Sequence, residues 1–141
     1  TTSPLELDRN DIAIWLRTGR PDLVVDASGP FQAYGDDPYC VVKACIALGV
    51  DYLDFADGAG FVFGVSQFDA DAKTAGVFVL SGVSSFPVLP GAVLRNMAER
   101  MEIVSVTGGI APTPYAGIGL NVMRAVVGYV SIPEQKGSSS R

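Results

Sequence analysis

Histidine is absent from this 141-residue sequence, and its absence removes two common kinds of chemistry. No serine or cysteine nucleophile can be activated by the usual histidine base, and most zinc sites lose a ligand. Cysteine is scarce as well. Cys40 and Cys45 lie five residues apart on a predicted helix, so they point in different directions and are too far apart for an unstrained disulfide. We interpret both as small core residues, which fits a reducing cytoplasmic location.

Positive charge is also limited, with ten basic residues against fifteen acidic ones and a net charge of −5. No cluster of lysine and arginine is available to neutralise the phosphates of a nucleic acid, and anionic lipid would repel the chain. Long hydrophobic runs are missing too. The longest, residues 86–94, is interrupted by Pro87, Pro90 and Gly91. The sequence therefore predicts neither a nucleic-acid partner nor a membrane partner.

What the sequence does have is an alternation of short apolar runs with helix-like segments, and a 48% hydrophobic content that suits one domain. The runs begin near residues 22, 51 and 77, so they are 29 and 26 residues apart, and each gap holds one helix. This spacing predicts an α/β fold, namely a partial doubly wound, Rossmann-like parallel sheet. The unbroken apolar run at 23–25 further predicts a strand that is buried on both faces.

Capping residues and glycines indicate where the helices begin and end. The first predicted helix follows Asp8 and stops at Gly19, and the second begins near Asp37 and ends at Gly49. The others are predicted at about 67–75 and 90–100.

Beyond residue 101 the pattern changes. Residues 102–107 alternate polar and apolar, which predicts a half-exposed antiparallel strand, and an apolar helix is predicted at about 120–130. We therefore expect residues 1–101 to be the C-terminal portion of a Rossmann-like domain. Residues 102–136 would begin an α+β substrate or dimerisation domain, with residues 137–141 as a flexible tail.

The nearest match to a G-x-G-x-x-G dinucleotide loop is the segment 58–64, which is one residue too long. The residues at 61–65 are β-prone rather than helix-forming, and no acidic residue closes a second strand at the distance a ribose hydroxyl needs. A tight turn is therefore the favoured interpretation, and a pyrophosphate cradle is the alternative.

Ligands of open α/β sheets bind beyond the carboxyl ends of the strands, so the turns there hold the candidate site residues. The turn after the first strand contains small residues that would let a ligand approach, although an ordinary turn explains them equally well. Those residues are Ala27, Ser28, Gly29, Pro30 and Phe31.

The turn after the third strand offers Gly82, Ser84 and Pro87, with Ser84 able to hydrogen-bond a ligand or the nearby backbone. It does not match G-x-S-x-G, and with no histidine a serine hydrolase is excluded.

Three carboxylates lie along the second strand. Alternation places Asp51 and Asp57 on one face and Asp54 on the other, so no metal site is predicted. Asp57, followed by Gly58, stands where it would meet a ligand, although a solvated turn explains it as well.

These segments together resemble the saccharopine dehydrogenase-like oxidoreductases. The resemblance is specific over residues 21–31, 34–35, 41–45 and 49–54, and it continues more loosely to about residue 115. It implies an N-terminal Rossmann domain followed by a substrate and dimerisation domain, with NAD or NADP as cofactor. It also implies oxidation or reduction at a carbon–nitrogen, and sometimes a carbon–carbon, bond of a small-molecule substrate.

The family's first strand and glycine-rich loop have no counterpart in this sequence. By the resemblance, residues 27–31 would border the nicotinamide ribose and carboxamide, and the turns at Asp57-Gly58 and 82–87 would line the substrate side. We expect a fragment of an NAD(P)-dependent oxidoreductase that by itself binds NADP(H) weakly or not at all. Asp57, Tyr34 and Lys43 are candidate proton donors, with none favoured.

The alternative is a non-catalytic, Rossmann-like interaction module that pairs through the exposed strand edge at 23–25. A homo-oligomer, or pairing with the rest of a longer parent protein, is expected on either view.

Overall fold

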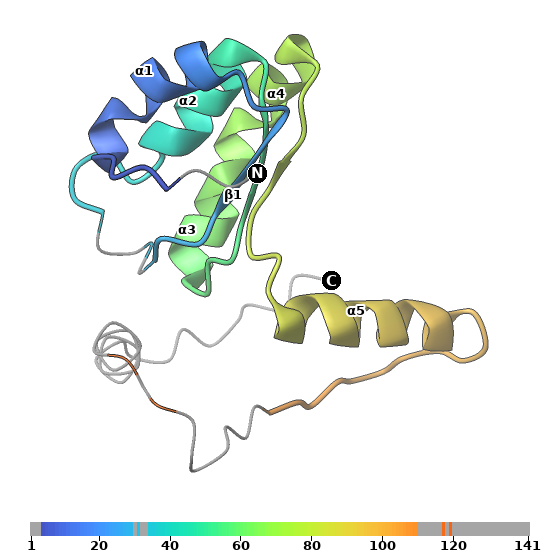
Figure 1. The fold of residues 1–141 in the computed structure, drawn as a ribbon. Coiled ribbons are helices and arrows are strands. Elements are labelled where there is room, and N and C mark those ends of the chain that lie inside the picture. The colour runs from blue at the N-terminus through green and yellow to red at the C-terminus, as the bar shows by residue number, and fades with distance from the viewer. Residues whose placement is uncertain (1–3, 30, 32–33, 110–116, 118, 120–141) are drawn as a thin grey trace. The chain divides into compact units, whose positions relative to one another are not determined.

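The structure is a computed structural model, and it describes residues 4–29, 31, 34–109, 117 and 119 of the chain (Figure 1). By its internal contacts the chain divides into two compact units, Thr1–Ile110 and Ala111–Arg141. The predicted helix at 120–130 and the tail at 137–141 lie outside the described residues. The predicted domain boundary near residue 101 remains a prediction.

Three parallel strands form the sheet, in the order β1-β2-β3. Leu23 pairs with Asp51 and Asp26 with Asp54, while Tyr52 pairs with Val79. The strands are β1 (Leu23–Asp26), β2 (Asp51–Asp54) and β3 (Val79–Leu80). This arrangement confirms the predicted α/β class with helical crossovers between parallel strands.

The helices fill the gaps that the spacing predicted. Before β1 stand η1 (Arg9–Asp11) and α1 (Ile12–Gly19), and α2 (Cys40–Leu48) connects β1 to β2. The connection from β2 to β3 is α3 (Ala59–Gly64), η3 (Val65–Phe68) and α4 (Asp69–Ala75). The last described helix is α5 (Ser85–Ala98). Among the described residues, no helix combines the length and the hydropathy that crossing a bilayer would require.

Local capping explains several helix ends. The Asp8 carboxylate accepts a hydrogen bond from the Asn10 N–H at 2.8 Å, and Gly49 and Gly76 end α2 and α4 in the left-handed conformation that glycine adopts without strain. At the end of α1 the prediction was one residue short. Arg20, not Gly19, takes the left-handed position, with φ of 43°.

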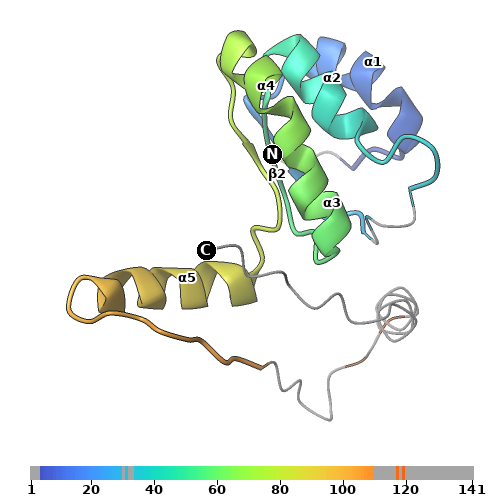
Figure 2. The ribbon, with the colours of Figure 1, turned by 180° about the vertical axis from the view of Figure 1, so that it is seen from behind.

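Helices α1 to α4 lie on one side of the sheet (Figures 1 and 2). There Tyr52 of β2 is fully buried beneath Leu16 of α1 and Val42 and Cys45 of α2. Each crossover leads to the next strand in the same direction, and right-handed crossovers then place all their helices on the same face.

The opposite face of the sheet is exposed. Leu23 and Val25 of β1 are 41% and 50% exposed, and Leu80 of β3 is 51% exposed. The prediction that the strand at 23–25 is buried on both faces was therefore wrong. An unbroken apolar run describes the strand's side chains, but whether a second layer covers them depends on the topology.

Three other predictions about secondary structure were wrong. The segment after Gly58 is helical, because Phe61 and Val65 are one helical turn apart and are buried together against Phe31 and Ala56. Helix α5 begins at Ser85 rather than at residue 90. Residues 102–109 form no strand within the described part of the chain, where none of the three strands of the sheet pairs with them.

Candidate functional site

The carboxyl ends of the three strands and the turns that follow them occur at one edge of the sheet, because the strands are parallel. Backbone hydrogen bonds join these turns. The N–H of Phe55 donates to the carbonyl oxygen of Asp26 at 3.4 Å, and the N–H of Val83 donates to that of Asp54 at 2.8 Å. The segments after β2 and β3 are thus each fastened to the end of the strand before them.

Asp54 ties the second turn to the third. Its side chain is fully buried, and Oδ1 accepts hydrogen bonds from the Ala56 N–H at 2.9 Å, the Ser81 hydroxyl at 3.0 Å and the Gly82 N–H at 2.9 Å. Oδ2 is buried without a hydrogen-bond partner among the described residues. Two of these three donors, the Ser81 hydroxyl and the Gly82 N–H, belong to the third turn, so this one carboxylate oxygen links the two turns.

Glycine is required at position 82 for two reasons. Its φ is +72°, a conformation that costs other L-residues roughly 1–2 kcal/mol, and a β-carbon would lie 3.3 Å from the Val62 side chain.

A second polar cluster surrounds Asp26 at the end of β1. Its carboxylate accepts hydrogen bonds from the Ser28 N–H at 3.0 Å, from the Ser28 hydroxyl at 2.6 Å and from Arg9 Nη1 at 2.7 Å. The Tyr52 hydroxyl also donates to it, at 3.4 Å. Burial opposes ionisation of Asp26, but the hydrogen bonds from Ser28 and Arg9 outweigh it, so the pKa is lowered and the carboxylate is charged at neutral pH.

Arg9 closes this cluster from the outside. Its guanidinium lies 3.6 Å from the centre of the Tyr34 ring, and Nη1 also donates to Ser28 Oγ at 3.0 Å. The Tyr34 and Ser28 hydroxyls are 2.8 Å apart. Burial raises the pKa of Tyr34, although Ser28 and Arg9 act against that rise, so the phenol holds its proton at neutral pH. The cluster thus presents one anion, one cation and one phenol at the carboxyl end of β1.

The structure places the residues predicted in the first turn in different environments. Ala27 and Ser28 are exposed, while Gly29 is half-buried, with the Phe31 ring 3.4 Å from where a β-carbon would be. Phe31 is only 2% exposed and packs inward, with its ring centre 5.1 Å from that of Phe61. Pro30 lies outside the described residues. Ala27 and Ser28 are therefore the residues of this turn that a ligand can reach.

In the second turn, Asp57 is exposed and Gly58 is buried, and the Gly58 carbonyl oxygen accepts the Val62 N–H at 3.0 Å as α3 begins. In the third turn, Gly82 and Ser84 are half-buried, and Pro87 is exposed in the first turn of α5. The Ser84 N–H donates to the Gly82 carbonyl oxygen at 2.7 Å.

The structure separates two of the candidate proton donors. Tyr34 lies beside Ser28, whereas Lys43 forms an exposed ion pair with Asp37 at 2.8 Å on the helical layer. Sequence reasoning did not assign Arg9, Asp26 or Asp54 a role in holding the turns by hydrogen bonds. The two aspartates carried a signal, since each ends an apolar strand, but no sequence pattern connects Arg9 to Asp26.

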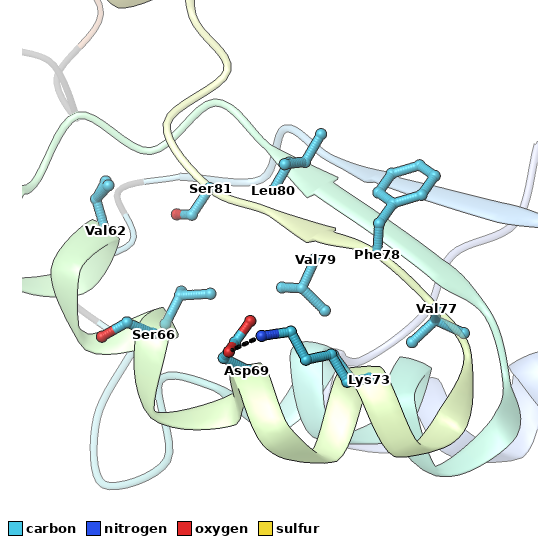
Figure 3. Close-up of a pocket in the computed structure, with 11 residues that line it drawn as sticks. Val62, Ser66, Asp69, Lys73, Val77, Phe78, Val79, Leu80 and Ser81 are labelled. Carbon is cyan, nitrogen blue, oxygen red and sulfur yellow. Dashed lines mark hydrogen bonds and ion pairs between the residues drawn. The ribbon is translucent and has the colours of Figure 1, made fainter.

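A cavity of about 420 Å³ lies along β3, between that strand and α3, η3 and α4 (Figure 3). Its walls include Val62 and Val79, and the ion pair between Lys73 and Asp69, at 2.6 Å, lies among its lining residues. Ser81 connects it to the third turn, but its lining does not include Ser28, Asp57 or Ser84. The turns thus share a sheet edge, and this cavity lies to one side of them.

No group of three or more carboxylate or thiol side chains gathers as a metal site in the part of the chain that the structure describes. Comparison of the chain with protein-family models, with curated proteins and with solved structures gave no match in any of the three. The fold class therefore rests on strand order and register alone.

Proposed function

We propose that this chain forms part of an NAD(P)-dependent oxidoreductase, similar to saccharopine dehydrogenase, that moves a hydride to or from a small metabolite. The observation that carries the proposal is the joining of three βα turns at one edge of a parallel sheet. The Phe55 N–H bond to the Asp26 carbonyl oxygen joins the first two, and the Asp54 carboxylate joins the second to the third. This is the edge at which dinucleotides bind in doubly wound folds.

In this proposal the first turn borders the nicotinamide, and Ala27 and Ser28 are the residues that approach it. The cofactor supplies the hydride chemistry, so the protein needs to position the ring and provide a proton. Tyr34 is near enough for the second task, because its hydroxyl lies 2.8 Å from Ser28 Oγ in the turn that borders the nicotinamide. Asp57, in the neighbouring turn, is the other proton donor that remains.

The proposal is tested by NMR titration of the ¹⁵N-labelled chain with nicotinamide mononucleotide, and separately with AMP. The nicotinamide half of the dinucleotide should shift the amide signals of Ser28, Gly29 and Gly82, and AMP should not. Ser28→Ala should weaken the response several-fold. Ser66→Ala is the matched control, because the Ser66 hydroxyl donates to the Phe63 carbonyl oxygen at 2.7 Å, away from these turns.

Intact NADP(H) should bind weakly, with a dissociation constant above the micromolar range, because the sequence has no glycine-rich pyrophosphate loop. Equal shifts with both mononucleotides, or shifts confined to the cavity beside β3, would remove the basis of the proposal.

One observation favours the second candidate, a non-catalytic interaction module. Strand β1 is an edge of the three-stranded sheet, and Leu23 and Val25 on it are 41% and 50% exposed. An exposed apolar edge invites pairing with a strand of another chain. Val25→Pro should abolish association through this edge, because the N–H of residue 25 points away from β2 toward the open edge. Proline is itself apolar, so association through the open face of the sheet should stay in place.

A further inference from the structure

The open face of the sheet is largely apolar, and a carboxylate within it, that of Asp51, accepts the Phe78 N–H at 3.0 Å. Figure 3 shows Phe78 and Leu80 pointing away from the cavity, while Val79 between them points toward it. The same alternation runs through the paired strands, since Leu80 pairs with Leu53. The exposed members of this surface, hereafter the open face, are Leu23 at 41%, Val25 at 50%, Phe55 at 44%, Phe78 at 44% and Leu80 at 51%.

Helix α5 carries a second exposed apolar surface. Four of its large side chains follow one another at intervals of three, four and four residues, so they form a single stripe along the helix. We call them the α5 stripe: Phe86 at 41% exposed, Leu89 at 65%, Val93 at 57% and Met97 at 39%. A stripe of this kind is the surface that a helix packs against a sheet.

We propose that the α5 stripe of one copy of this chain covers the open face of a second copy, and that the exchange is reciprocal. Parallel sheets are almost always covered by helices on both faces, and here the crossover helices cover one face only. The dimensions agree. A sheet of three strands is about 14 Å wide at 4.8 Å per strand. Helix α5, with 14 residues, is about 21 Å long at 1.5 Å per residue.

A second copy is favoured as the occupant because both surfaces are exposed within the same chain. The connection from β3 to α5 is only residues 81–84, and three of its groups are held by Asp54: the Ser81 hydroxyl, the Gly82 N–H and the Val83 N–H. This connection therefore fixes the point at which α5 leaves the sheet.

The area of contact supports reciprocal exchange over simple stacking of two sheets. Side chains of this size that are about half exposed can each bury roughly 80 Å². Stacking two open faces then buries only about 800 Å², within the range of crystal contacts. Two α5-on-sheet contacts bury roughly 1,500 Å², which is the size of a standard specific interface. The dimer does not depend on the proposed oxidoreductase function.

Sedimentation velocity of the full chain over a range of concentrations tests the proposal. The chain should form a dimer, and Val93→Glu on the α5 stripe should weaken it at least tenfold. Val88→Glu is the matched control: Val88 is also exposed, at 48%, but lies on the other side of the same helix, so this variant should dimerise within twofold of the original.

The sheet side has its own pair of variants. Phe78→Ser should weaken the dimer at least tenfold, while Phe63→Ser should not, because Phe63 is 76% exposed on helix α3. Circular dichroism of each variant reports whether it is folded.

A mixture of the two weakened variants distinguishes reciprocal exchange from other dimers. The Val93→Glu copy retains an intact open face, and the Phe78→Ser copy retains an intact α5 stripe, so one of the two contacts is restored in the mixture. The mixture should therefore dimerise more tightly than either variant alone. A chain that stays monomeric at high concentration, equal loss in Val88→Glu and Val93→Glu, or a mixture no tighter than its components would each overturn the proposal.

Discussion

The two faces of the sheet have similar side chains and opposite surroundings. On the helical side, Tyr52 and the facing Val42 are both completely buried, whereas Val25 and Leu80 on the other side are half exposed. The difference comes from topology rather than from composition, because all the crossovers advance in one direction and place their helices together. Hydrophobicity of a strand thus indicates that it can be buried, and connectivity determines which face is covered.

The covered face also contains the polar groups that organise the turns. Asp26 and Asp54 are 7% and 0% exposed. Their burial is tolerated because Arg9 and Ser28 donate to Asp26, and backbone N–H groups donate to Asp54. The open face has no comparable network among the described residues. Tight packing and buried hydrogen bonds are therefore both concentrated on the covered face of the sheet.

Truncation of a leucine on each face should give the largest contrast. Leu16→Ala removes a side chain that is 1% exposed and leaves a cavity, so it should lower the free energy of unfolding by about 3 kcal/mol. Leu80→Ala should lower it by less than about 1 kcal/mol, because half of that side chain is already in water. Urea denaturation of dilute samples, followed by circular dichroism, measures both. Equal losses would mean that the open face is covered in solution.

A glycine pair in α3 tests how tightly the covered side is packed. A β-carbon at Gly64 would overlap the Tyr39 hydroxyl, and Tyr39 is held by stacking on Phe61 at a centroid distance of 4.8 Å. Gly64→Ala should therefore cost about 2 kcal/mol through overpacking. Gly60→Ala, in the same helix, meets nothing within 4 Å and should stabilise by about 0.5 kcal/mol, since alanine is the better helix former. Stabilisation by both would indicate a loose interior.

The sequence alone predicted the three strands, the helix in each gap and the parallel order. Unbroken apolar runs that are separated by the length of a helical crossover are compatible with few other folds. It failed at 61–65, where β-prone residues form a helix in order to bury Phe61 and Val65 together. Local preference was overridden there by packing.

The candidate site was predictable only in outline. The turns follow from the strand ends, and Ser28 lies within the predicted first turn. Arg9 reaches Asp26 across 17 residues of sequence, a contact that exists only after α1 has packed against α2. No local pattern records such a pairing.

Alkaline pH should destabilise the covered side by a smaller amount. Burial, with a contribution from the charge of Asp26, raises the pKa of the Cys45 thiol from its ordinary 9.0 to about 12. Between these values the unfolded chain loses the thiol proton while the folded chain keeps it, so stability is unchanged below pH 9 and falls as pH rises toward 12. At pH 10 the loss is about 1.4 kcal/mol. Burial also raises the pKa of Tyr52, with the same sign.

The two cysteines separate this effect from a general response to base. Cys45→Ala should remove most of the fall in unfolding free energy between pH 8 and pH 10, because its thiol is completely buried. Cys40→Ala should retain the fall, because Cys40 is only partly buried. Urea denaturation at the two pH values measures the difference. A fall of the same size in the Cys45→Ala chain would show that the Cys45 thiol does not cause the loss of stability. The covered face around Tyr52 would then be more accessible to solvent than its packing indicates.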